Sequence, residues 1–82
     1  MKLPRDLTGP DLMRALRGLG YAVTRQSGSH MRLTTSVNGT HHVTVPNHDP
    51  LKTGTLLGGV LKPVAQHHGL TVNTLLEKLN LR

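Results

Sequence analysis

Between residues 21 and 46 the apolar side chains recur at every second position, and this period of two constrains the fold more than any other feature of the sequence. Met31 and Leu33 share one face of one alternating segment, and Val43 and Val45 share one face of the next. Such alternation is typical of strands that bury one face and expose the other. The sequence therefore predicts a sheet with one face on the core.

Two turn sequences divide this region into three strands. Ser27-Gly28-Ser29 ends the first strand, on which Tyr21, Val23 and Arg25 alternate with Ala22, Thr24 and Gln26. Asn38-Gly39, the dipeptide preferred in type I′ hairpins, separates the second strand from the third, which Pro46 ends. Because strands joined by short turns pair antiparallel, the sequence predicts a three-stranded antiparallel sheet.

Helices are expected on both sides of this region in the sequence. Thr8 and Asp11 have the spacing of a capping box, and the helix that follows should end at Gly18 or Gly20. Its apolar stripe consists of Leu12, Ala15, Leu16 and Leu19.

A second helix is expected after the loop 47–52, with Thr53 as its cap and Gly69 at its end. Gly58, Gly59 and Pro63 weaken this helix. Its apolar face consists of Leu56, Leu57, Val60, Leu61 and Val64. A short third helix should begin at Thr71 and bury Leu75, Leu76 and Leu79.

The order of elements predicts an α+β fold in which the helices pack on one face of the sheet. The chain is 82 residues long, so we expect residues 1–82 to form a single domain. The chain has no Cys and its first residues lack an apolar signal or membrane segment, so we expect a cytoplasmic protein with no membrane partner.

The charge and the aromatic content narrow the function. Ten Lys and Arg against four Asp and Glu give a net charge of +6, which favours a polyanion such as RNA or one acidic protein partner. Tyr21 is the only aromatic residue among Phe, Tyr and Trp, so base stacking on aromatic platforms is disfavoured. Recognition of the nucleic-acid backbone is the expected mode.

Among the six histidines, His30 is the strongest catalytic candidate. It follows the turn and should lie on the outer face of the sheet with Arg32 and Thr34, where an imidazole could exchange protons with a bound phosphodiester. The alternative is a structural one, in which His30 bonds to the backbone of the turn.

The other histidines have structural explanations. His41 and His42 point to opposite faces of one strand, so they cannot share a metal, and His41 is expected beside the core. The pair 67–68 lies near a helix C-terminus, where imidazoles interact favourably with the dipole. A zinc site gathering His30, His42 and His48 has no recognised ligand spacing, and no metal or cofactor is predicted.

Lys52 precedes the start of the second helix, and Thr53, Gly54 and Thr55 follow it. Free backbone N–H groups, the helix dipole and a cation together can bind an anion, so a phosphate could dock there. An ordinary capped helix start explains the same residues.

Several short motifs in order resemble the HicA toxin family, and they span nearly the whole chain. They are LRGLGY at 16–21, RQSGSH at 25–30, VTVPNH at 43–48, LKTGTL at 51–56, then Leu61-Lys62 and His68-Gly69-Leu70. The chain departs from the family at Met31 and Arg32 and in the second helix, where better helix formers are usual.

This resemblance implies a fold similar to double-stranded-RNA-binding domains, ribosome-independent cleavage of mRNA, and inhibition by a HicB-type antitoxin. The family's catalytic His would be His30, within the motif Gly28-Ser29-His30. Gly28, Ser29 and Lys52 would contact RNA, Arg32 is our addition to this set, and His48 or His42 would be supporting groups. The alternatives are an RNA-binding or partner-binding module without catalysis and, less favoured, a metal-dependent nuclease.

Overall fold

A computed structural model describes residues 3–4 and 6–81. The first helix, α1 (Gly9–Leu16), begins at the predicted capping box: the Asp11 N–H donates to the Thr8 hydroxyl at 3.1 Å, and the Thr8 N–H donates to the Asp11 carboxylate at 3.4 Å. The short 3₁₀ helix η1 (Arg17–Leu19) continues it. Gly20, with a φ of 84°, is the left-handed residue that ends the helical region.

Three strands then form the predicted antiparallel sheet in the order β1-β2-β3. They are β1 (Ala22–Ser27), β2 (His30–Thr35) and β3 (His41–Pro46). Asn38 and Gly39 both have positive φ, as a type I′ turn requires, although the connection from 36 to 40 is longer than a two-residue hairpin loop. The inner face of the sheet buries Met31, Leu33, Val43 and Val45, as the alternation predicted.

The second helical region differs from a regular α-helix. It consists of a π-helix, η2 (Thr55–Leu61), followed directly by α2 (Lys62–His67), and the Lys62 N–H donates to the carbonyl of Leu57, five residues earlier. Pro63 has no N–H to donate back into this turn, and the preceding Gly58 and Gly59 are exposed, so water can bind the carbonyls left without a donor. Gly69, with a φ of 68°, follows the end of α2 as predicted.

The second helical region buries four of its five predicted apolar residues. A π-helix has more than four residues per turn, and the buried positions are Leu56, Val60, Leu61, Val64 and Ala65. Leu57 is partly buried and packs against the core, so it belongs to the apolar face as predicted. Ala65 was missed.

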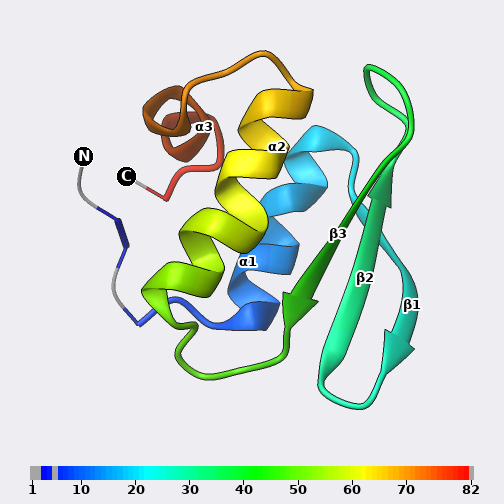
Figure 1. The fold of residues 1–82 in the computed structure, drawn as a ribbon, viewed down its shortest axis with the longest axis vertical. Helices are drawn as coiled ribbons and strands as arrows, with labels where there is room; N and C mark the ends of the chain where they lie inside the picture. The colour runs from blue at the N-terminus through cyan, green and yellow to red at the C-terminus, as the bar shows by residue number, and fades with distance from the viewer. Residues whose placement is uncertain (1–2, 5, 82) are drawn as a thin grey trace.

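The helix α3 (Val72–Lys78) closes the fold. Thr71 caps it by accepting the Thr74 N–H at 3.1 Å. Figure 1 shows α1 and α2 side by side against one face of the sheet, with α3 on the side of the helices away from the sheet. The architecture is α+β and matches the α-β-β-β-α order of double-stranded-RNA-binding domains, with α3 added.

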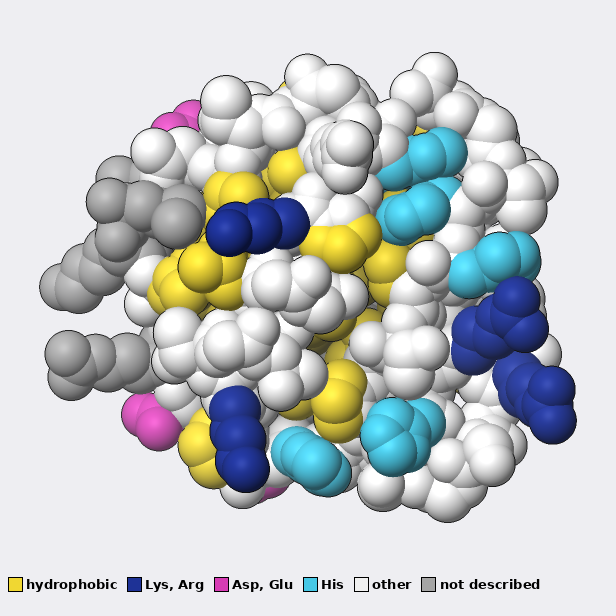
Figure 2. Space-filling model, in the orientation of Figure 1, with side chains coloured by type: hydrophobic (Ala, Val, Ile, Leu, Met, Phe, Trp, Pro, Cys, Tyr) yellow, Lys and Arg dark blue, Asp and Glu magenta, His cyan; other side chains and the backbone are white. Residues whose placement is uncertain are grey.

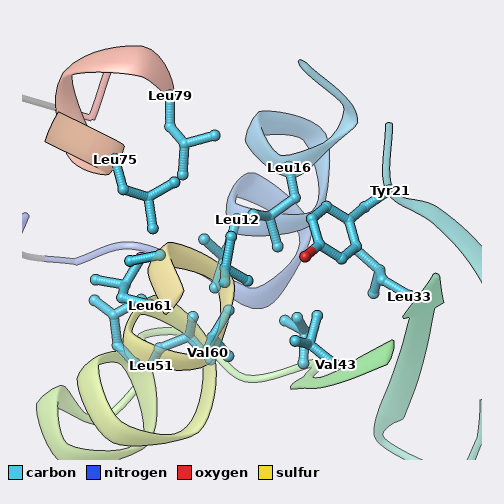
Figure 3. Packing of buried hydrophobic residues seen from close by; sticks show 14 of the residues in the cluster. Leu12, Leu16, Tyr21, Leu33, Val43, Leu51, Val60, Leu61, Leu75 and Leu79 are labelled. Atoms are coloured by element: carbon cyan, nitrogen blue, oxygen red, sulfur yellow. The ribbon is translucent and has the colours of Figure 1, made fainter. Parts of the chain in front are cut away.

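The core lies between the sheet and the helices. Figure 3 shows the Tyr21 ring between α1 and the sheet, near Leu16 and Leu33, while Leu75 of α3 and Leu79, the residue after α3, approach from the opposite side. Within residues 3–4 and 6–81, the helices are too short or too polar to cross a membrane.

Candidate functional site

His30 lies where the alternation predicted. It is the first residue of β2, directly after the two-residue turn Gly28-Ser29, and its side chain is exposed. It pairs with Ser27 of β1 and with Pro46 of β3. Because the neighbouring Met31 is buried on the inner face, His30 points to the outer face.

Arg32 lies two residues further along the same face, so its Cα is about 7 Å from that of His30. It pairs with Thr44 of β3 and with Arg25 of β1. Cross-strand partners point to the same face, so Arg25 is also on the outer face. The alternation had assigned Arg25 to the same face as Tyr21 and Val23, and this prediction was wrong.

A β-bulge at Thr24 is the reason. Val23 pairs with Leu33 and Arg25 with Arg32, which leaves Thr24 without a partner in the ladder. Because of this extra residue, each side chain of β1 after Thr24 points to the face opposite to the one that regular alternation would give it. The signal in the sequence was Arg25 itself, because an arginine at a position that the alternation assigns to an apolar face indicates a break in register.

His42 is held further along the outer face. Its Nδ1 lies 2.7 Å from the Thr34 hydroxyl, which in turn lies 2.8 Å from the Thr24 hydroxyl. His42 pairs with Thr34, four residues along β2 from His30, which corresponds to about 13 Å. The sheet therefore separates His42 from His30.

His48 and His30 lie at the same end of the sheet. His48 follows Pro46, the partner of His30, by two residues, and both histidines are exposed. The Asn47 N–H donates to the carbonyl of Ser29 at 2.6 Å, which ties the loop to the β1–β2 turn.

Helix α1 holds this loop from the other side. The Gly9 N–H donates to the carbonyl of His48 at 2.9 Å. The two backbones are so close that a Cβ on Gly9 would lie 2.0 Å from the Pro46 carbonyl oxygen. Gly9 is thus required by the close approach of the loop that carries His48.

Lys52 lies at the start of the second helical region and is exposed. Its carbonyl accepts the Leu56 N–H at 2.9 Å, so Lys52, and not the predicted Thr53, is the N-cap residue. Figure 1 shows that the β1–β2 turn, the loop after β3 and this helix start lie at one end of the molecule. In Figure 2, His side chains and a Lys or Arg side chain lie next to one another at that end.

The fold does not bring together His30, His42 and His48, the three histidines of the zinc alternative. Among the described residues, no three His, Cys, Asp or Glu side chains are placed to hold a metal ion. His42 lies about 13 Å along the sheet from the position of His30, which accounts for this.

A second group of histidines surrounds Tyr21 away from this end. The buried Tyr21 hydroxyl lies 2.7 Å from His41 Nδ1 and 3.2 Å from His68 Nε2. His67 stacks on His41 at 4.4 Å between ring centroids, and its Nε2 lies 3.0 Å from the carbonyls of Val37 and Gly39. These contacts give His41 the structural role that was predicted, but the sequence did not predict that the pair 67–68 packs against it.

Two imidazoles of this cluster, those of His41 and His68, favour the neutral form. Burial lowers the pKa of His41 and of His68, and the neighbouring imidazoles lower both further. Burial also raises the pKa of Tyr21 to about 12, so the hydroxyl keeps its proton. That one proton can be donated to His41 or to His68 but not to both, so the hydroxyl must accept from the other ring.

We expect the free energy of unfolding to fall as the pH is lowered through about 6.5, because the unfolded chain then binds protons that His41 and His68 resist. Urea denaturation between about pH 7.5 and 5 measures this. The variant His41→Asn/His68→Gln, whose amides replace the two bonded nitrogens, should show a flatter pH dependence, and His42→Asn on the outer face should not. A wild-type stability that rises toward pH 5 would contradict the expectation.

The sequence model of one protein family, the HicA toxin of bacterial toxin–antitoxin systems, matches residues 9–58, which are more than half of the chain. The chain belongs to the HicA toxin family. The match covers α1, the whole sheet and the loop to Lys52, and therefore all the residues gathered at this end of the molecule. Comparisons with curated proteins and with solved structures find no match. This HicA family member is thus the toxin of a toxin–antitoxin system.

Proposed function

We propose that this HicA toxin is a metal-independent endoribonuclease that cleaves mRNA without the ribosome, with His30 as general acid or base. The observation that carries the proposal is the placement of His30. It is exposed, on the outer face of the sheet, with Arg32 on the same strand and with the start of the second helical region, which Lys52 begins, at the same end of the molecule. A proton-exchanging group beside cations is what phosphodiester cleavage requires.

The chemistry needs only groups that these side chains supply. The 2′-hydroxyl loses its proton to a base and attacks the adjacent phosphorus, the bond to the 5′-oxygen breaks, and that oxygen takes up a proton. The products are a 2′,3′-cyclic phosphate and a 5′-hydroxyl. His30 exchanges one of these protons, His48 is our candidate for the other, and Arg32 and Lys52 neutralise phosphate charge.

The backbone around the turn also contributes. Gly28 and Ser29 form the two-residue turn beside His30, and Gly28 has a φ of 57° that suits glycine. We propose that this turn contacts the RNA backbone next to the scissile group. His42, held by Thr34 further along the sheet, would contact RNA away from the reacting atoms.

The expected partner is a HicB-type antitoxin with an acidic surface. The chain carries ten Lys and Arg against four Asp and Glu, and an acidic protein covering the basic face would exclude RNA from it. We place this activity in the cytoplasm, where mRNA is available, and assign it to residues 1–82 acting as one domain.

Incubation of the purified protein with a long mRNA in excess chelator tests the function. We expect cleavage, with fragments that end in 2′,3′-cyclic phosphate and begin with 5′-hydroxyl, detected by end-labelling before and after phosphatase treatment. Cleavage that chelator abolishes would contradict metal independence. RNA binding without cleavage would favour the alternative, a binding module of the same fold.

A further inference from the structure

The outer face of the sheet presents two arginines directly opposite each other. Arg25 of β1 and Arg32 of β2 are cross-strand partners, and both side chains are exposed. Like charges in this position repel and destabilise a strand pair. Over residues 3–4 and 6–81 the only ion pair joins Arg14 to Asp11, so no acidic side chain offsets this repulsion.

The β-bulge is what brings the two arginines together. With regular alternation from Val23, which pairs with the buried Leu33, Arg25 would share the inner face. The unpaired Thr24 places it opposite Arg32 instead. The local backbone therefore creates the charge pair, although the pair costs stability.

The surroundings of the pair are polar. Thr44 lies across from Arg32 on β3, and Thr24, Thr34 and His42 form the next row of the sheet, linked through their side chains. Tyr21, the only Phe, Tyr or Trp in the chain, is buried, so this face cannot stack bases on an aromatic ring of that kind. Guanidinium and hydroxyl groups instead suit phosphate oxygens.

We propose that the outer face of the sheet is a phosphate-binding surface on which Arg25 and Arg32 hold the backbone of single-stranded RNA beside His30. This inference rests on the proposed function and extends it by naming Arg25 and the path of the RNA across the three strands. Figure 2 shows Lys and Arg side chains adjoining one another at the sheet side of the molecule, with a His side chain beside them.

Salt-dependent binding tests the inference without cleavage. In a His30→Ala background, the affinity for a short fluorescent single-stranded RNA of mixed sequence is measured by anisotropy over a range of NaCl concentrations. The slope of log affinity against log salt is negative, and each lost phosphate contact reduces its magnitude by about 0.7. We expect Arg25→Gln and Arg32→Gln each to reduce the magnitude of the slope by about 0.7, and the double variant by about 1.4.

Arg17→Gln is the matched control, because Arg17 is exposed, lies on η1 and is not part of the sheet. An equal change in slope for this control would mean that only net charge matters and would overturn the proposal. Thermal unfolding gives a second readout: removal of one arginine from a repelling pair should leave the Tm unchanged or raise it. A clear fall in Tm would show a structural role for the arginine and would also overturn the proposal.

Two further outcomes separate this inference from the proposed function. If the wild type cleaves RNA but the arginine variants bind RNA unchanged, the function stands and the phosphate surface does not. If those variants instead lose affinity for an acidic antitoxin, the face belongs to the protein partner. If the salt slopes of the arginine variants fall in magnitude as expected while the wild type cleaves no RNA, the phosphate-binding surface is supported and the proposed cleavage is contradicted.

Discussion

His30→Ala is expected to lower the rate of mRNA cleavage by ~10²–10⁴-fold, the usual contribution of one general acid or base. The side chain is exposed, so the free energy of unfolding should change by less than about 0.5 kcal/mol. Single-turnover cleavage of a defined RNA, with circular dichroism on the same samples, measures both effects.

His42→Ala is the matched control for this result. It removes another exposed histidine from the same face of the sheet, about 13 Å further along, and should leave the chemical step within a few-fold of the wild type. His48→Ala then tests the second proton-transfer group, since His48 lies at the end of the molecule where His30 lies. Equal rates for wild type and His30→Ala would remove His30 from the mechanism.

Gly9→Ala is expected to destabilise the protein by about 3 kcal/mol, because the new Cβ would overlap the Pro46 carbonyl oxygen and lie 3.0 Å from the Cα of Asn47. Neither contact can be relieved by rotating a side chain. The loop would have to move away from α1, and with it the bond from the Asn47 N–H to the carbonyl of Ser29, next to His30. Urea denaturation gives the loss of stability.

Gly58→Ala provides the comparison. It makes the same chemical change at an exposed helical glycine where a Cβ would meet no atom within 4 Å. This variant should be as stable as the wild type or more stable by up to about 1 kcal/mol. If Gly9→Ala and Gly58→Ala behave alike, the close approach of α1 and the loop is not what requires glycine at position 9.

The fold was largely predictable because its signals are local. The capping box at Thr8, the left-handed Gly20 and Gly69, and the alternation in β2 and β3 each act within a few residues. The bulge at Thr24, which only Arg25 signalled, and the π-helix η2 were not predicted, because each depends on elements distant in the sequence. A bulge depends on how two strands pair, and the width of a helical turn depends on the volume to be filled beneath it.

The residues of the candidate site likewise include some that a local pattern predicted and some that it did not. Alternation alone placed His30 and Arg32 on the outer face, and the role of His30 stays a prediction until it is tested. Arg25 was missed because its orientation follows from the bulge. The packing of His67 on His41 was missed because it joins the end of a helix to a strand 26 residues earlier.

The bulge also separates two registers at this edge of the sheet. Tyr21, just before β1, is buried in the core, and Val23 pairs with Leu33 on the inner face although it is 41% exposed, whereas Arg25 to Ser27 follow the register of the β1–β2 turn. A change in the residues after Thr24 therefore alters what the surface offers without altering what the interior buries. Within one short strand, mutation can explore new contacts with ligands while the packing that folds the chain is conserved.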